Sequence, residues 1–88
     1  MVRLYYKELV DDAFYWLPVS TSTGATILFQ DVHFAVEAAM DIKADEFEIR
    51  TSAHERSLKG LRFGKEILWR LNGKHRSIQY RGTTNRFV

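Results

Sequence analysis

The dipeptide Asn72-Gly73 constrains the fold of this chain more than any other feature of its sequence. It lies between two segments that contain β-favouring residues, Glu66–Leu71 and Lys74–Arg81. Asn-Gly is the preferred dipeptide of a two-residue type I′ turn, whose twist matches that of the strands it joins. The sequence therefore predicts an antiparallel β-hairpin in its last third.

A two-residue loop would also fix which residues of this hairpin face each other. Leu71 is then expected opposite Lys74, and Trp69 opposite Arg76. One hairpin face would be apolar towards its base, and the other would be polar and basic. A basic face could hold phosphate oxygens, and the alternative is that it is simply the solvated side of the sheet. The predicted binding residues lie on this face and at the hairpin tip; they are Arg70, Lys74, His75, Arg76 and Arg81.

Four further segments resemble strands, because they combine β-favouring residues with alternation or with flanking turn residues. Asp11 and Asp12 fit a turn between the first two. Pro18 ends the second or places it at a sheet edge, because proline has no N–H to donate. In the last segment apolar and charged residues alternate cleanly, which predicts a half-buried strand. The four are Val2–Leu9, Ala13–Leu17, Ala25–Gln30 and Glu46–Ser52.

One segment, Val32–Lys43, is predicted to be helical. Asp31 precedes it and is a suitable N-cap, because its carboxylate can accept from the free N–H groups of the first turn. Apolar residues recur at helical spacing and form one stripe that would face the core. The stripe contains Val32, Ala35, Val36 and Ala39, with Ile42 or Lys43 as its continuation.

Two segments have no clear periodicity. Ala53–Gly64 is interpreted as a helical turn around Glu55–Lys59 that Gly60 breaks, and Gly82–Val88 as a loop with a fraying end. The 88 residues contain no repeat and no linker, so we expect a single domain over residues 1–88. The predicted fold class is α+β, with a single antiparallel sheet of five or six strands and one helix packed on one face.

Residue usage favours a cytoplasmic protein. The chain has no cysteine, which excludes disulfides and thiolate metal sites and fits a reducing compartment. No apolar run is long enough to span a membrane, and the first residues lack the apolar stretch of a signal peptide. We expect no membrane partner.

The sequence contains no recognisable catalytic apparatus. There is no Gly-x-Ser-x-Gly elbow and no phosphate-binding loop, and the three histidines form no metal-ligand pair. The acidic pairs Asp11-Asp12 and Asp45-Glu46 are interpreted as turn or cap residues. We therefore expect no catalytic residue, no metal and no cofactor, and a binding protein is favoured over an enzyme.

Charge is distributed unevenly along the chain. Residues 1–55 contain four basic and ten acidic residues, a net charge of −6, and residues 56–88 contain nine basic and one acidic residue, a net charge of +8. Such asymmetry suggests a charged partner, unless the two halves interleave in the sheet and neutralise each other.

The favoured function is a small binding or regulatory module that engages nucleic acid, or a nucleic-acid-handling protein, through a charged face. The basic half would contact nucleic acid, and the acidic half a basic protein surface. One alternative is a phage-type inhibitor of a host defence machine, similar in kind to anti-CRISPR proteins. Another is a homodimer in which exposed edge strands pair.

A third alternative comes from three short segments. Leu58-Lys59-Gly60, Leu68-Trp69-Arg70 and Arg76-Ser77-Ile78-Gln79-Tyr80 resemble the C-terminal sheet of RelE/HigB-type toxins. The resemblance implies a metal-free ribonuclease that uses basic and tyrosine or histidine side chains. These toxins begin with a strand followed by helices, whereas here three predicted strands precede the helix.

Overall fold

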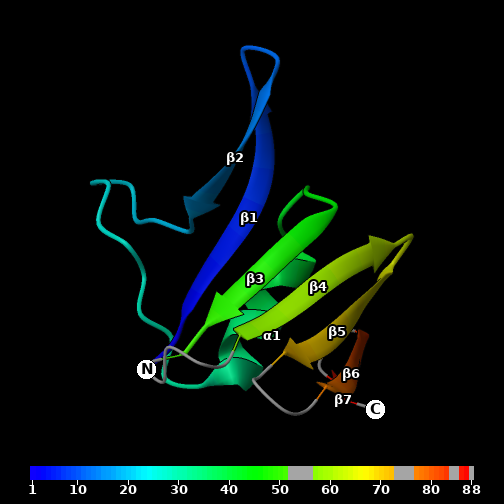
Figure 1. Ribbon diagram of the computed structural model, residues 1–88. Coiled ribbons are helices and arrows are strands. Elements are labelled where there is room, and N and C mark those ends of the chain that lie inside the picture. Colours follow the sequence, from blue (N-terminus) through cyan, green and yellow to red (C-terminus); the bar gives the residue numbers. More distant parts are fainter. Residues whose placement is uncertain (52–56, 73–76, 84–85, 88) are drawn as a thin grey trace.

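One antiparallel sheet and one helix make up the fold, which confirms the predicted α+β class (Figure 1). The computed structural model describes residues 1–51, 57–72, 77–83 and 86–87. The elements are β1 (Arg3–Val10), β2 (Ala13–Pro18), α1 (Val32–Met40), β3 (Glu46–Arg50), β4 (Ser57–Phe63), β5 (Glu66–Asn72), β6 (Ser77–Thr83) and β7 (Arg86–Phe87).

The strands follow one another across the sheet almost in chain order, as β2-β1-β3-β4-β5-β6-β7. The exception is β2, which lies on the far side of β1 from β3. The chain leaves β2 through a long loop and α1, and α1 covers one face of the sheet before β3 begins (Figure 1). The face that α1 covers is called the inner face, and the opposite one the outer face.

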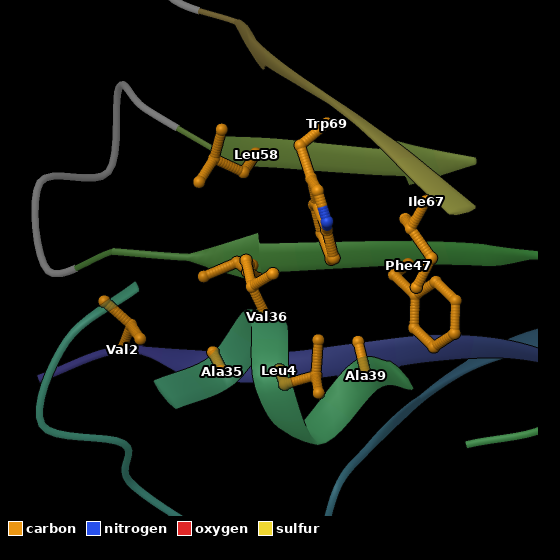
Figure 2. Packing of buried hydrophobic residues seen from close by; sticks show 10 residues of the cluster. Val2, Leu4, Ala35, Val36, Ala39, Phe47, Leu58, Ile67 and Trp69 are labelled. Carbon is orange, nitrogen blue, oxygen red and sulfur yellow. The ribbon is translucent and has the colours of Figure 1, made fainter. Parts of the chain in front are cut away.

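The core lies between α1 and the inner face (Figure 2). Ala35, Val36 and Ala39 of α1 are buried, as the apolar stripe predicts. The N–H of Phe34 donates to Oδ1 of Asp31 at 3.3 Å, which confirms the N-cap. Among the described residues, the buried apolar side chains are Val2, Leu4, Ala35, Val36, Ala39, Phe47, Ile49, Leu58, Ile67 and Trp69.

The helix ends at Met40, three residues earlier than predicted, and Arg62 of β4 binds its C-terminal end. The guanidinium of Arg62 donates to the carbonyl oxygens of Ala39 at 3.0 Å, Ile42 at 2.8 Å and Ala44 at 2.9 Å. The last carbonyls of a helix have no partner within the helix, and a cation also interacts favourably with that end of the helix dipole. Arg62 therefore stabilises the turn that leads from α1 into β3.

β1 and β2 extend beyond β3 as a two-stranded arm, residues 7–16 (Figure 1). The β1–β3 register ends where Tyr6 faces Phe47, whereas β1 and β2 remain paired up to Val10 and Ala13. Asp11 and Asp12 close the arm with φ of 50° and 66°. Positive φ at both central residues is the geometry of a type I′ turn, so the predicted turn is confirmed. Pro18 is the last residue of the edge strand β2, also as expected.

Two predicted elements are wrong. Ala25–Gln30 is a loop that makes only isolated bridges, Ser20 with Thr26 and Val2 with Phe29, rather than a strand. The helical turn predicted around Glu55–Lys59 is replaced, from Ser57 onward, by β4. Gly60 fits this strand because the Trp69 ring packs where a side chain on Gly60 would stand.

The predicted register of the last hairpin is also wrong. Asn72 pairs with Ser77, and Trp69 pairs with Tyr80 instead of Arg76. Leu71 therefore pairs with Ile78, and Trp69 with Tyr80, whereas a two-residue loop would have placed Lys74 and Arg76 opposite these two residues. Because the register shifts by an even number of residues, the paired residues of β5 and β6 keep their predicted faces of the sheet. The expected C-terminal loop is corrected too, since β6 continues to Thr83 and β7 follows.

Candidate functional site

The outer face of the sheet is the candidate functional surface, because no element covers it in the described part of the chain. Side chains of a strand alternate between the two faces, and Glu48, Lys59 and Arg70 are aligned across β3, β4 and β5 on the outer side. The neighbouring row contains Glu46, Leu61 and Leu68. Polar and apolar rows therefore lie next to each other on this face.

A shallow hollow of about 280 Å³ lies over these two rows. Its lining combines an indole, two leucines, two cations and one carboxylate, so it offers both apolar contact and charge. The lining residues are Trp16, Glu46, Phe47, Lys59, Gly60, Leu61, Leu68 and Arg70.

The acidic side chains of β3 on this face have basic partners. Nζ of Lys7 lies 3.0 Å from Oε2 of Glu46. Nε of Arg50 donates to Oε1 of Glu48 at 2.7 Å. These pairs neutralise the two carboxylates nearest the hollow, and they leave its lysine and arginine to determine its charge.

Arg50 is held in place on two sides. Its guanidinium carbon lies 3.8 Å from the ring centroid of Tyr5, which is a cation–π arrangement. The hydrogen bond to Glu48 is the main reason that the pKa of Arg50 is raised above its ordinary value, and the charge of Glu48 adds to the effect. Arg50 is thus a structural cation on the outer face.

Lys59 and Arg70 face each other directly in the β4–β5 register and are exposed. Within the part of the chain that the structure describes, neither side chain has an ion-pair partner. Two like charges opposite each other destabilise a sheet. An anion placed between them would relieve this repulsion and accept hydrogen bonds from both.

One exposed aromatic residue lines the hollow, and two others lie farther away. Trp16 forms one side of it, and Phe14 lies farther out on the arm, where Nζ of Lys7 is 5.0 Å from its ring centroid. Phe63 stands exposed at the end of β4. By strand alternation all three side chains are on the outer face, where they add exposed apolar surface.

The predicted binding residues differ in where the structure places them. Arg70 is exposed and lines the hollow. The backbone position of Arg81 is opposite Leu68 in β6, one strand from the hollow. Lys74, His75 and Arg76 lie outside the described residues.

Sequence reasoning missed Trp16, Lys59 and Leu61 as members of the site. The alternation Leu58, Lys59, Gly60, Leu61 was the pattern that could have revealed β4 and its outward-facing residues. Trp16 could not be assigned from local pattern, because it reaches the hollow from the opposite end of the sequence.

The described residues contain no group of three or more His, Cys, Asp or Glu side chains that could hold a metal ion. Their helix, α1, is too short to cross a membrane. A second hollow lies at the C-terminal end of α1, but the guanidinium of Arg62 there is already bound to three carbonyls. Comparison with protein-family models, curated protein sequences and solved structures finds no match to this chain.

Proposed function

We propose that this protein binds single-stranded nucleic acid on the outer face of its sheet. The observation that carries the proposal is the hollow in which two facing cations, Lys59 and Arg70, lie beside an exposed indole and two leucines. A single strand supplies both matching chemistries, since its phosphates are anionic and its bases have apolar faces.

The two parts of the site would act differently. Lys59 and Arg70 would contact phosphates, which gives affinity without sequence information and makes binding sensitive to salt. Trp16 would stack on a base, an interaction worth about 1–3 kcal/mol per base. The hollow lies on a sheet face, which cannot enter a groove, and the two-stranded arm beside it contains the acidic residues Glu8, Asp11 and Asp12, which phosphates would repel. Unpaired bases therefore suit this site better than a duplex.

Fluorescence anisotropy with labelled oligothymidylate and oligouridylate of about 12 nucleotides tests the proposal, a length that covers the usual site sizes. Lys59→Glu and Arg70→Glu should each lower affinity by about tenfold or more, because each reversal replaces an attraction by a repulsion. Lys43→Glu is the matched control: Lys43 is exposed and follows α1, away from the outer face. It should change affinity by less than about twofold.

Salt dependence gives a second measurement. Removing both cations with a Lys59→Ala, Arg70→Ala double variant should make the slope of log affinity against log salt shallower by about 1.4 for a single strand. An unchanged slope would contradict the assignment of these residues to phosphates. Tighter binding of the matching duplex would contradict the single-strand preference.

Intrinsic fluorescence reports on stacking directly, because the two tryptophans differ in exposure. Trp16 is 37% exposed, and Trp69 is 0% exposed. A stacked base should therefore quench Trp16 and leave Trp69 unaffected, and a Trp16→Phe variant should lose the quenching while still binding. A denaturing gel of the RNA after incubation separates binding from the ribonuclease alternative, and intact RNA supports the binding function.

A further inference from the structure

The arm has an open hydrogen-bonding edge with a defined length. The N–H of Val19 donates to the carbonyl of Leu4 at 2.8 Å. Backbone groups of a strand alternate in direction, so the odd-numbered residues of β2 bond to β1. The N–H and C=O groups of Phe14 and Trp16 therefore point away from the sheet, where the described residues provide no further strand.

The same edge stops at Pro18. Proline has no N–H, and the carbonyl of Pro18 already accepts a hydrogen bond from Oγ of Ser20 at 3.1 Å. At the other end, Asp11 and Asp12 form the turn. The edge can thus pair with another strand through Phe14 and Trp16, and not beyond them.

The side chains of the arm also lack cover. Leu9, Val10, Phe14, Tyr15 and Trp16 are all exposed. A two-stranded hairpin is marginally stable alone in water, and three or more strands with an apolar face are needed for independent stability. A strand added at the β2 edge would supply that support.

We infer that the added strand is β2 of a second copy of this chain, paired antiparallel about a two-fold axis at Tyr15. In this register Phe14 of each copy faces Trp16 of the other and exchanges both N–H···O=C bonds with it. It is the one symmetric register that uses both open donors of each copy. Pairing Phe14 with itself would bring Trp16 against the turn residue Asp12. Pairing Trp16 with itself would place Phe14 against the blocked Pro18.

Charge favours the same arrangement. The segment from Glu8 to Trp16 contains Glu8, Asp11 and Asp12 and no basic residue. Antiparallel pairing at Tyr15 places the two acidic turns about 23 Å apart, since about seven residues of strand at ~3.3 Å each separate them. A parallel pair would put the turns side by side and repel.

The size of the contact predicts a weak dimer. The exposed parts of Phe14, Tyr15 and Trp16 amount to roughly 350 Å² per copy, or about 700 Å² per pair, if each side chain can bury ~150–250 Å². This is below the ~1,200 Å² of a stable interface, so the dissociation constant should be in the micromolar range or above. The two-fold axis would stand perpendicular to the sheet, so both outer faces would lie on the same side. The inference does not rest on the proposed function, although both use the side chain of Trp16.

Disulfide trapping tests the register. The chain has no cysteine, so a single introduced cysteine reports on one position. Tyr15 would face its own copy in a non-hydrogen-bonded pair with Cα atoms about 4.5 Å apart, within the range of a disulfide. Tyr15→Cys should form a covalent dimer rapidly under mild oxidation. Leu9→Cys is the matched control, with 56% exposure against 52% for Tyr15, because Leu9 would be separated from its own copy by three strand spacings.

Sedimentation velocity of the unmodified chain up to about 1 mM tests the association itself. Phe14→Lys should weaken dimerisation by about tenfold or more, because it places a second cation beside Lys7 at the contact. Phe63→Lys should leave it unchanged, since Phe63 is 61% exposed against 64% for Phe14 but lies at the end of β4. A monomer at all concentrations would overturn the inference. So would equal cross-linking of the two cysteine variants, or a dimer indifferent to Phe14→Lys.

Discussion

Gly60 shows how one residue can determine an element. The local sequence pattern predicts that Gly60 ends a helical turn. In the structure Gly60 belongs to β4, and its missing side chain leaves room for the Trp69 ring. A Cβ on Gly60 would lie 2.8 Å from Cζ3 of Trp69 and 2.9 Å from Cγ2 of Ile67. These contacts come from the next strand, so no local rule could reveal them.

Gly60→Ala should therefore destabilise the fold by about 1–3 kcal/mol, the usual cost of overpacking a core. Trp69 is fully buried and cannot move aside without displacing Phe47, whose ring centroid lies 6.0 Å from that of Trp69. Urea unfolding followed by circular dichroism measures the change. Lys59→Ala, one position away and exposed, is the control and should cost less than about 0.5 kcal/mol. Equal midpoints for the two variants would refute the packing argument.

At the scale of elements, the sequence best predicted those segments in which one hydrophobic periodicity continues without interruption. The α1 stripe, its Asp31 cap and the alternation of β3 are all confirmed, because each depends on residues a few positions apart. The hairpin register failed for the opposite reason. Asn72-Gly73 favours a two-residue loop locally, whereas the structure pairs Leu71 with Ile78 on the face that forms the core. Turn preference is worth little against the direct pairing of apolar residues across the two strands.

The residues of the candidate site likewise divide into those that the sequence could predict and those that it could not. Arg70 could be predicted because the hairpin was recognised and its faces survived an even shift of register. Lys59 could not be assigned to its side, since Ala53–Gly64 was interpreted as helical. Trp16 belongs to a strand that reaches the hollow only through the order β2-β1-β3.

Arg62 connects two elements, and its replacement tests that connection. Arg62→Lys keeps the charge beside the end of α1 but cannot reproduce the fork that binds the carbonyls of Ala39, Ile42 and Ala44. We expect a loss of about 1–3 kcal/mol in the free energy of unfolding, because the carbonyls of this part-buried turn would lose hydrogen bonds from the guanidinium. The carbonyls of Ala39 and Ile42 would keep their backbone donors, the N–H groups of Ile42 and Ala44. Thermal unfolding measures it, with Lys65→Ala on the exposed β4–β5 turn as the control. Unaltered stability of Arg62→Lys would mean that charge alone suffices.

At the scale of the molecule, strand order preserves only part of the charge asymmetry of the sequence. The halves do not interleave: β2, β1 and β3 occupy one side of the sheet and β4 to β7 the other. The two halves meet where β3 pairs with β4. β4 to β7 contain five basic residues and one acidic residue, whereas β2, β1 and β3 contain three of each, because most acidic residues of the first half lie outside these strands. The sheet is therefore basic in sequence along one half of its width and neutral along the other, and the hollow with Lys59 and Arg70 lies next to this boundary.

The same arrangement predicts that stability is distributed unevenly. β3, β4 and β5 are paired on both sides and contribute buried residues to the core, whereas the arm has two strands and exposed side chains. Amide exchange measured by NMR at low protein concentration should thus be fast for Tyr15, through local opening of the arm, and slow for Phe47 and Ile49, which exchange only on global unfolding. Protection of Tyr15 should rise with protein concentration if the arms pair, while that of Ile49 should rise much less. Uniform protection of Tyr15 and Phe47 at every concentration would mean that the arm unfolds together with the core.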